Sequence, residues 1–228
     1  MGTFIEDMSL RDRLRVFADR RDAGRQLAKV LLKYRNTNTI VMAIPAGGVP
    51  VAAELATALH LPADLVIVRK IQMPDNPEAG IGAMSPDGEM ILNVSWVARL
   101  HITKDEIIAQ KQKTLDTIQK REQTFRKKRP YHNMRERTVI LVDDGLASGY
   151  TMLVAVDFMR SLDPLKVVIA VPTASNTTVD MLLPKVEELV CLNVRRGNYF
   201  AVADAYRNWY DLGDEEVLSI IGAGPFQV

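Results

Sequence analysis

Hydrophobic and polar positions along this chain follow two periods, one typical of buried strands and one typical of amphipathic helices. Short apolar runs rich in β-branched residues are typical of strands buried on both faces, and they occur at residues 39–44, 64–71, 138–142, 166–171 and 188–194. The segments between them place apolar side chains at helical spacing, at residues 19–34, 51–59, 149–161 and 177–183. This alternation predicts an α/β fold with a parallel sheet flanked by helices on both faces.

The middle of the chain interrupts this alternation. Residues 72–82 are rich in Pro, Gly and acids and lack periodicity, which predicts a loop. The turn sequence at residues 85–88, Ser-Pro-Asp-Gly, predicts a hairpin between two short apolar runs. Thr103 and Glu106 have the spacing of a capping box, which predicts a long helix that reaches about residue 126.

We therefore expect a single domain over residues 1–228 with three parts. The core covers about residues 19–80 and 138–195, and the hairpin and long helix form an insert at about residues 81–137. Short helices around Asp204 and at residues 214–221 form a small C-terminal hood at about residues 196–228.

The most informative pattern lies at residues 139–151, Val-Ile-Leu-Val-Asp-Asp-Gly-Leu-Ala-Ser-Gly-Tyr-Thr. An apolar strand ends in two carboxylates, and a loop of small residues then leads into a helix. Free backbone N–H groups and the helix dipole favour an anion at a helix N-terminus. Ser148 and Thr151 add hydroxyl groups, and Gly149 permits close approach of the backbone. The pattern predicts a sugar-phosphate site.

Two other interpretations of this segment are weaker. Asp143 and Asp144 could simply end a strand while Ser148 caps a helix, but capping requires only one such residue. A receiver-type phosphoacceptor pocket would draw acids from several strand ends, and the other predicted strands end near Pro45, Lys70 and Pro172 instead.

The same thirteen residues closely resemble the signature of type I phosphoribosyltransferases, which bind 5-phosphoribosyl 1-diphosphate (PRPP). The resemblance implies that the two acids hold the ribose hydroxyls and that the loop holds the 5-phosphate. By position it assigns PRPP binding to Asp143, Asp144, Gly145, Leu146, Ala147, Ser148, Gly149, Tyr150 and Thr151.

Two further segments resemble diphosphate-binding parts of that family. Residues 45–50, Pro-Ala-Gly-Gly-Val-Pro, are similar to its pyrophosphate loop, and the basic pair at residues 69–70 is similar to that of orotate-type members. A plain tight turn and an exposed strand end are the alternatives. Related chains often have a basic residue where Ala46 stands, and the family's catalytic-loop pattern is absent from residues 72–90. The resemblance assigns diphosphate binding to Ala46, Gly47, Gly48, Arg69 and Lys70.

The resemblance implies a base site near the C-terminal hood, for which we expect Val171, Pro172 and Phe200. Tyr206 and Trp209 also fit ordinary packing, so the sequence does not identify the base. The expected reaction transfers the phosphoribosyl group of PRPP to a small nitrogenous base. Asp143, Asp144 and Lys70 are the expected catalytic residues, and Mg²⁺ is held mainly by ligand oxygens with Asp143 and Asp144 as candidate ligands. The alternative is a non-catalytic module that binds PRPP or a nucleotide as a regulatory ligand.

The amino-acid composition limits the kinds of ligand and partner that this chain is expected to bind. A net charge of +1 with 25% charged and 47% hydrophobic residues is ordinary for a soluble domain and points to neither nucleic acid nor a membrane. The single cysteine, Cys191, lies in an apolar run, and the three histidines are far apart, so no thiolate or histidine metal site is expected. We expect a cytoplasmic protein, and a homodimer in which the insert serves as a dimer arm or a lid.

Overall fold

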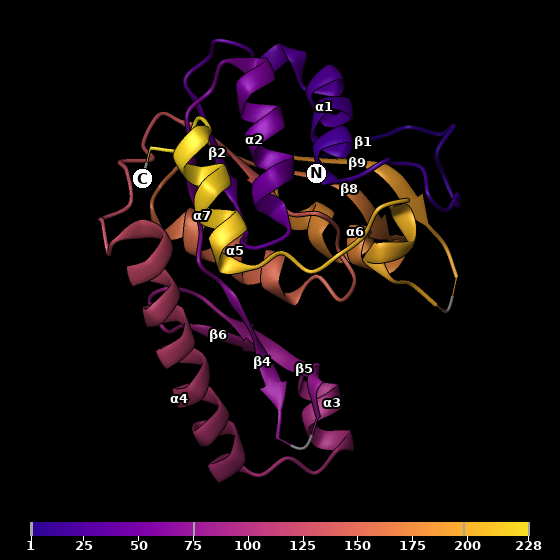
Figure 1. Ribbon diagram of the computed structural model, residues 1–228. Helices are drawn as coiled ribbons and strands as arrows, with labels where there is room; N and C mark the ends of the chain where they lie inside the picture. The colour runs from indigo at the N-terminus through magenta and orange to yellow at the C-terminus, as the bar shows by residue number, and fades with distance from the viewer. Residues whose placement is uncertain (1, 75, 198, 228) are drawn as a thin grey trace.

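The computed structural model describes residues 2–74, 76–197 and 199–227, without the side chains of residues 77 and 78. Its main body is a six-stranded sheet in the order β1-β9-β8-β7-β2-β3, and every neighbouring pair is parallel (Figure 1). The expected parallel sheet is confirmed. Its strands are β1 (Thr3–Glu6), β2 (Thr39–Ala43), β3 (Ala63–Leu65), β7 (Thr138–Val142), β8 (Lys166–Ser175) and β9 (Glu188–Arg195).

Helices cover both faces of this sheet, as the apolar runs predict. In β2, Val41 and Ala43 face one hydrophobic cluster, whereas Ile40 and Met42 face a second cluster on the other side. The first face is covered by α1 (Arg20–Val30), α2 (Gly48–Leu59) and α7 (Asp214–Ala223). The second face is covered by α5 (Tyr150–Ser161) and α6 (Asn176–Leu182). Short 3-10 turns complete the body: η1 (Leu32–Tyr34), η3 (Leu183–Lys185) and η4 (Val202–Ala205).

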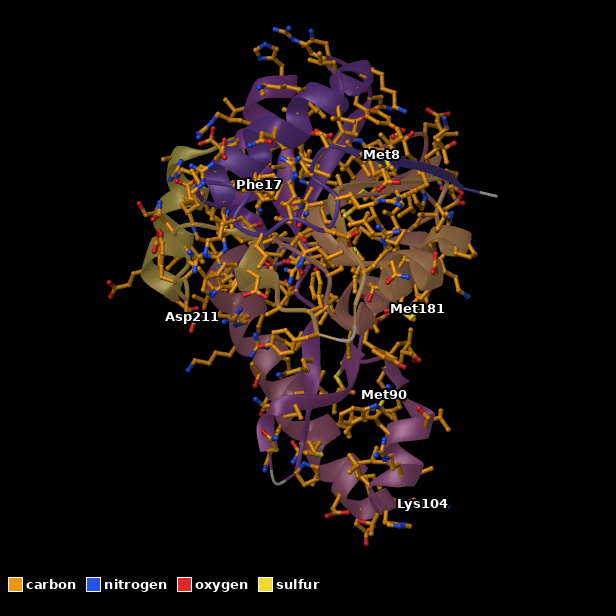
Figure 2. All side chains as sticks on the ribbon, turned by 90° about the vertical axis from the view of Figure 1, so that its right-hand side faces the viewer. Met8, Phe17, Met90, Lys104, Met181 and Asp211 are labelled. Atoms are coloured by element: carbon orange, nitrogen blue, oxygen red, sulfur yellow. The ribbon has the colours of Figure 1, made fainter. Side chains whose placement is uncertain are left out.

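Residues 69–126 form an arm that extends away from the body (Figure 1). Lys104 marks its far end in Figure 2. The expected hairpin turn is present, with Gly88 at a φ of 87°, and the capping box of Thr103 and Glu106 is formed. The arm contains a three-stranded antiparallel sheet of β4 (Arg69–Met73), β5 (Asn76–Met84) and β6 (Met90–Leu92), followed by α3 (Val94–Arg99), α4 (Lys104–Arg121) and the π-helical turn η2 (Glu122–Arg126).

Two expectations about the start of the arm are wrong. The apolar run at 64–71 is not one strand: β3 ends at Leu65, which pairs with Ala43, and β4 begins at Arg69 in the other sheet. Residues 72–82 are not a loop, because β5 pairs with β4 on one side and β6 on the other. Hydrogen bonding of β5 to its neighbouring strands outweighs the low strand propensity of Pro and Gly. The pairing register between β4 and β5 shifts on either side of Gln72, which accommodates the irregular part of the ladder. The strand β1 and the short helix α3 were not anticipated.

A buried ion pair anchors the arm to the body. Nη2 and Nε of Arg126 donate to the carboxylate of Asp64 at 3.0 and 3.2 Å, and Nη1 donates to Glu122 at 3.0 Å. The side chains of Arg126 and Asp64 are 0% and 1% exposed. Arg126, at the end of the helical segment that was expected from the sequence, is therefore buried rather than exposed to solvent. No helix in the described ranges is both long and apolar enough to cross a membrane.

Candidate active site

The loop between β7 and α5 is held against the ends of two neighbouring elements. The backbone N–H of Leu146 donates to the carbonyl of Thr173 at 2.9 Å, and that of Ser175 donates to the carbonyl of Leu146 at 3.1 Å. The hydroxyl of Thr178 donates to the carbonyl of Ala147. The carbonyl groups of this loop thus point toward the body of the protein, where they are satisfied.

The N–H groups of the same loop remain available. Within the described part of the chain, the backbone N–H groups of residues 147–149 donate no hydrogen bond, and neither does the hydroxyl of Ser148, which is exposed. Gly149 has a φ of 76°, and a Cβ atom there would lie 2.5 Å from Cγ2 of Thr178. Only glycine fits this conformation without strain. Open donors at the N-terminus of a twelve-residue helix favour a negatively charged group.

This loop forms one wall of a cavity of about 470 Å³. Val202 from η4 adds an apolar surface on the same side, and the arm forms the opposite wall. The stem of Lys70 crosses Gly80, where a Cβ atom would lie 2.6 Å from its Cδ. The arm contributes Lys70, Ala79, Gly80, Gly82, Asn93 and Trp96.

The acid pair, Asp143 and Asp144, lies next to the cavity, and the second acid is held by hydrogen bonds from other elements. Oδ2 of Asp144 accepts a hydrogen bond from Nε of Arg20 at 2.8 Å, and the carbonyl of Asp144 accepts one from the hydroxyl of Tyr206 at 2.5 Å. The guanidinium of Arg20 lies 3.9 Å from the ring centroid of Trp209 and donates to the carbonyl of Tyr210 at 2.8 Å. Helix α1 and the C-terminal hood together fix this carboxylate.

The glycine-rich turn after β2 touches the same carboxylate. A Cβ atom on Gly47 would lie 2.0 Å from Oδ2 of Asp144, and one on Gly48 would lie 2.6 Å from the carbonyl oxygen of Val142. The preceding peptide, Pro45 to Ala46, is cis. The glycines therefore allow the turn at 45–48 to pack directly against the end of β7.

Burial dominates the electrostatics of the two acids. It raises the pKa of Asp143 well above its ordinary value, and the adjacent charge of Asp144 raises it further. Burial also raises the pKa of Asp144, although the positive charge of Arg20 opposes this effect. The main-chain N–H of Asp144 donates to Oδ1 of Asp143 at 2.8 Å, which orients the first carboxylate.

The structure brings together many of the residues singled out from the sequence and separates others. Lys70 and residues 145–151 share the cavity wall, with Gly47 and the acid pair adjacent. Arg69 lines a different pocket, between α4 and β4. Val171 and Pro172 are buried, and Phe200 lies beside Arg195, 4.8 Å from its guanidinium carbon. Their roles in binding diphosphate or base stay predictions.

Three residues at this site were not identified from the sequence. Arg20 is among several charged residues in the first helix, and nothing local distinguishes it, because its partner is 124 residues away. Asn93 caps α3, and Trp96 is 45% exposed on that helix. A tryptophan in a mostly polar insert is the signal that could have indicated a ligand-facing position.

Comparison with known proteins identifies the family. The model of the phosphoribosyl transferase domain matches residues 18–204. The chain belongs to this family. Two Mycobacterium tuberculosis proteins provisionally named phosphoribosyl transferases are 36% identical to it over 208 residues, which cover 91% of this chain and 47% of each relative. The chain thus spans about half the length of these curated relatives.

Solved structures agree with the fold. The crystal structure of TT1426 from Thermus thermophilus is 35% identical, covers 91% of this chain and 98% of that one, and superimposes with a TM-score of 0.72. The AQ2163 protein from Aquifex aeolicus is only 14% identical, with a TM-score of 0.50 over 82% of this chain and 78% of that one. The second likeness concerns the fold alone.

Proposed function

We propose that this chain transfers the 5-phosphoribosyl group of PRPP to a nitrogenous base and releases diphosphate. The observation that carries the proposal is the cavity of about 470 Å³ whose wall is the loop at 145–151, with its open N–H groups next to a partly buried acid pair. Membership of the phosphoribosyl transferase family supports the same conclusion.

The residues suggest a division of roles within PRPP. The 5-phosphate occupies the loop at 147–151, where N–H groups and the dipole of α5 favour its charge. The ribose hydroxyls donate to the carboxylates of Asp143 and Asp144, and Arg20 keeps the second carboxylate in place. Diphosphate lies toward Lys70 and the turn at 45–48.

In the reaction, a nitrogen lone pair of the base forms a bond to C1 as the bond from C1 to the diphosphate oxygen breaks. The electron pair of that bond leaves with diphosphate, and C1 inverts. In this proposal, Asp143 and Asp144 balance the positive charge that develops on the sugar. The ammonium of Lys70 and the backbone amide of Gly47 balance the charge on the leaving group, whereas the N–H of Gly48 already donates to the carbonyl of Ile44 at 3.0 Å.

The donor set fits Mg²⁺ held mainly by the substrate. No group of three or more His, Cys, Asp or Glu side chains gathers as a metal site within the described ranges, and Asp144 already pairs with Arg20. Mg²⁺ readily keeps waters and binds phosphate oxygens with one or two carboxylates, for which Asp143 and Asp144 are the candidates. When bound, the ion neutralises charge on the diphosphate.

A non-catalytic module that binds PRPP or a nucleotide is the second candidate. Ala46 supports it, because a basic residue at this position would strengthen the grip on diphosphate. Both functions require the phosphate loop and the acid pair, so binding alone does not separate them.

The deciding experiment is isothermal titration with PRPP and Mg²⁺, followed in the same sample by an assay of diphosphate release across purine and pyrimidine bases. We expect saturable binding and release that depends on one base. Asp144→Asn should abolish release while the fold is retained. Binding without release for any base would favour the regulatory module, and absence of binding would refute both functions.

A further inference from the structure

A second, smaller cavity of about 140 Å³ lies within the arm, between α4 and β4. Its walls are polar, and none of the described residues that line it is acidic. Strand β4 contributes Arg69 and Gln72, and α4 contributes Gln110, Lys113 and Thr114. A cavity of this composition carries an excess of positive charge.

The positive charge of Arg69 is not balanced by an ion pair. Within the described part of the chain, its guanidinium makes no hydrogen bond and no salt bridge, and the ammonium of Lys113 makes none either. Burial lowers the pKa of Arg69 and the nearby charge of Arg121 lowers it further, although the nearby carboxylate of Asp214 opposes both effects. Nη1 of Arg121 is itself buried without a hydrogen-bond partner among the described residues. A bound anion would offset the burial and the repulsion that act on the charge of Arg69.

The side-chain amide of Gln110 is a second, independent indication of a ligand. Gln110 is only 6% exposed and lines the cavity, yet its amide makes no hydrogen bond to any other described residue. The amide N–H groups of Gln110 are therefore donors that no described residue uses and that are open to a ligand in the cavity.

We propose that this cavity is a binding site for one phosphate-type oxyanion, with charge supplied by Arg69 and Lys113 and a hydrogen bond donated by Gln110. Its volume is several times the roughly 30 Å³ that one water molecule occupies. It therefore accepts a single tetrahedral anion and is too small for a nucleoside. The bound group is either inorganic phosphate or the phosphate of an ester whose remainder projects outward.

This site differs from the sugar-phosphate cavity in its walls and in its volume. Lys70 lines both cavities, so the two are neighbours across β4. The phosphate loop at 145–151 contributes to the larger cavity only. Occupancy of one site can thus be tested while the other is disabled.

The test is titration of the ¹⁵N-labelled protein with inorganic phosphate, at constant ionic strength, observed at the Nε–Hε resonance of Arg69 and the amide resonances of Gln110. A parallel titration uses methyl phosphate. We expect saturable shifts at both side chains with at least one of the two ligands. Shifts with inorganic phosphate alone would identify the free ion as the ligand, and shifts with both would show that a phosphate ester also fits.

Variants assign the shifts to this site. Lys113→Glu, or Lys113→Gln if the first variant is poorly folded, should weaken binding roughly tenfold through loss of one charge-assisted hydrogen bond. Lys104→Glu makes the same charge change as Lys113→Glu on the same helix at the far end of the arm (Figure 2) and should leave binding unchanged. Ser148→Ala, in the larger cavity, should also leave it unchanged.

Three results would overturn the proposal. These are shifts that do not saturate with either ligand, equal weakening by Lys104→Glu and Lys113→Glu, and loss of the shifts in Ser148→Ala. The first two would indicate only a general response to charge, and the third would place the anion on the phosphate loop. Failure here leaves the proposed PRPP reaction untouched, because that reaction is assayed by diphosphate release.

Discussion

Nε of Arg20 donates a hydrogen bond to Oδ2 of Asp144 at 2.8 Å, although the two residues are 124 positions apart. Both side chains are largely buried, with 8% and 13% of their surface exposed. Trp209 covers the guanidinium, and Tyr206 donates to the carbonyl of Asp144. The orientation of the second acid is therefore set by the N-terminal helix and the C-terminal hood rather than by the motif that contains it.

Arg20→Ala should destabilise the protein by about 3–5 kcal/mol, because removal of one partner leaves the other charge buried and unpaired. Urea denaturation measures the loss. Arg21→Ala is the matched control, since Arg21 pairs with Glu54 while 53% exposed, and it should cost no more than about 1 kcal/mol. Equal losses in the two variants would contradict the role of the buried pair. In a double-mutant cycle with Asp144→Asn, the two losses should not add.

Asp143→Asn should stabilise the protein at neutral pH. The pKa of Asp143 is raised in the folded state, so this carboxyl binds its proton more tightly when folded than when unfolded. Its contribution to stability is therefore present at low pH and is lost as pH rises from about 3.9, the unfolded value, through the raised folded pKa.

Thermal unfolding of Asp143→Asn and the wild type between pH 4 and pH 8 measures this effect. The gap between them should widen as pH rises, by roughly 2–4 °C for each kcal/mol gained. The asparagine keeps the Oδ1 acceptor for the N–H of Asp144. A gap that is constant with pH, or a less stable variant at pH 7, would show that Asp143 is not destabilised by burial of its charge.

Gly47→Ala should abolish activity with only a moderate loss of stability. Its Cβ atom would lie 2.0 Å from Oδ2 of Asp144, so the carboxylate or the turn has to move. Gly222→Ala provides the control, because Gly222 in α7 has open space around it and alanine favours a helix by about 0.5–1 kcal/mol. Diphosphate release and PRPP titration should both fail for Gly47→Ala and be normal for Gly222→Ala. Normal activity in both would disprove the packing of Gly47 on the acid.

Trp96→Ala should raise the KM for the base roughly tenfold, which corresponds to the loss of one stacked ring, and should change the Kd for PRPP little. Val94→Ala is the control on the same helix, because Val94 is 75% exposed and does not line the cavity. Steady-state kinetics with the base varied at saturating PRPP gives the comparison. A change in PRPP affinity alone would place Trp96 at the phosphate end of the cavity.

Asp64→Ala should destabilise the protein by about 3–5 kcal/mol and loosen the arm, because the buried guanidinium of Arg126 would keep only Glu122 as a charged partner. Arg135→Ala removes the partner of Asp163 in a pair that is 73% and 77% exposed, and should have almost no effect. Hydrogen exchange in α4 reports on the arm. Exchange in α4 that is unchanged in Asp64→Ala would show that other contacts hold the arm in place.

The sequence by itself determined that the fold contains a parallel sheet, in which order most of its strands and helices follow one another along the chain, and where the loop at 145–151 lies. These features depend on local patterns: continuous apolar runs, helical spacing, and small residues directly after two acids. The parallel sheet and the helices on both faces were predictable because each run has to be buried on both sides. Cys191, which lies in one of these apolar runs, is buried, and burial raises the pKa of its thiol.

Only the tertiary structure decided where the strand after β3 belongs, what holds Asp144, and which residues line the candidate cavity. The run at 64–71 has no internal signal that it divides between two sheets, since pairing partners distant in sequence make that choice. Arg20 and Trp96 reach the site from elements far from the motif. Contacts between distant segments carry no local periodicity, so they become visible only when the chain is folded.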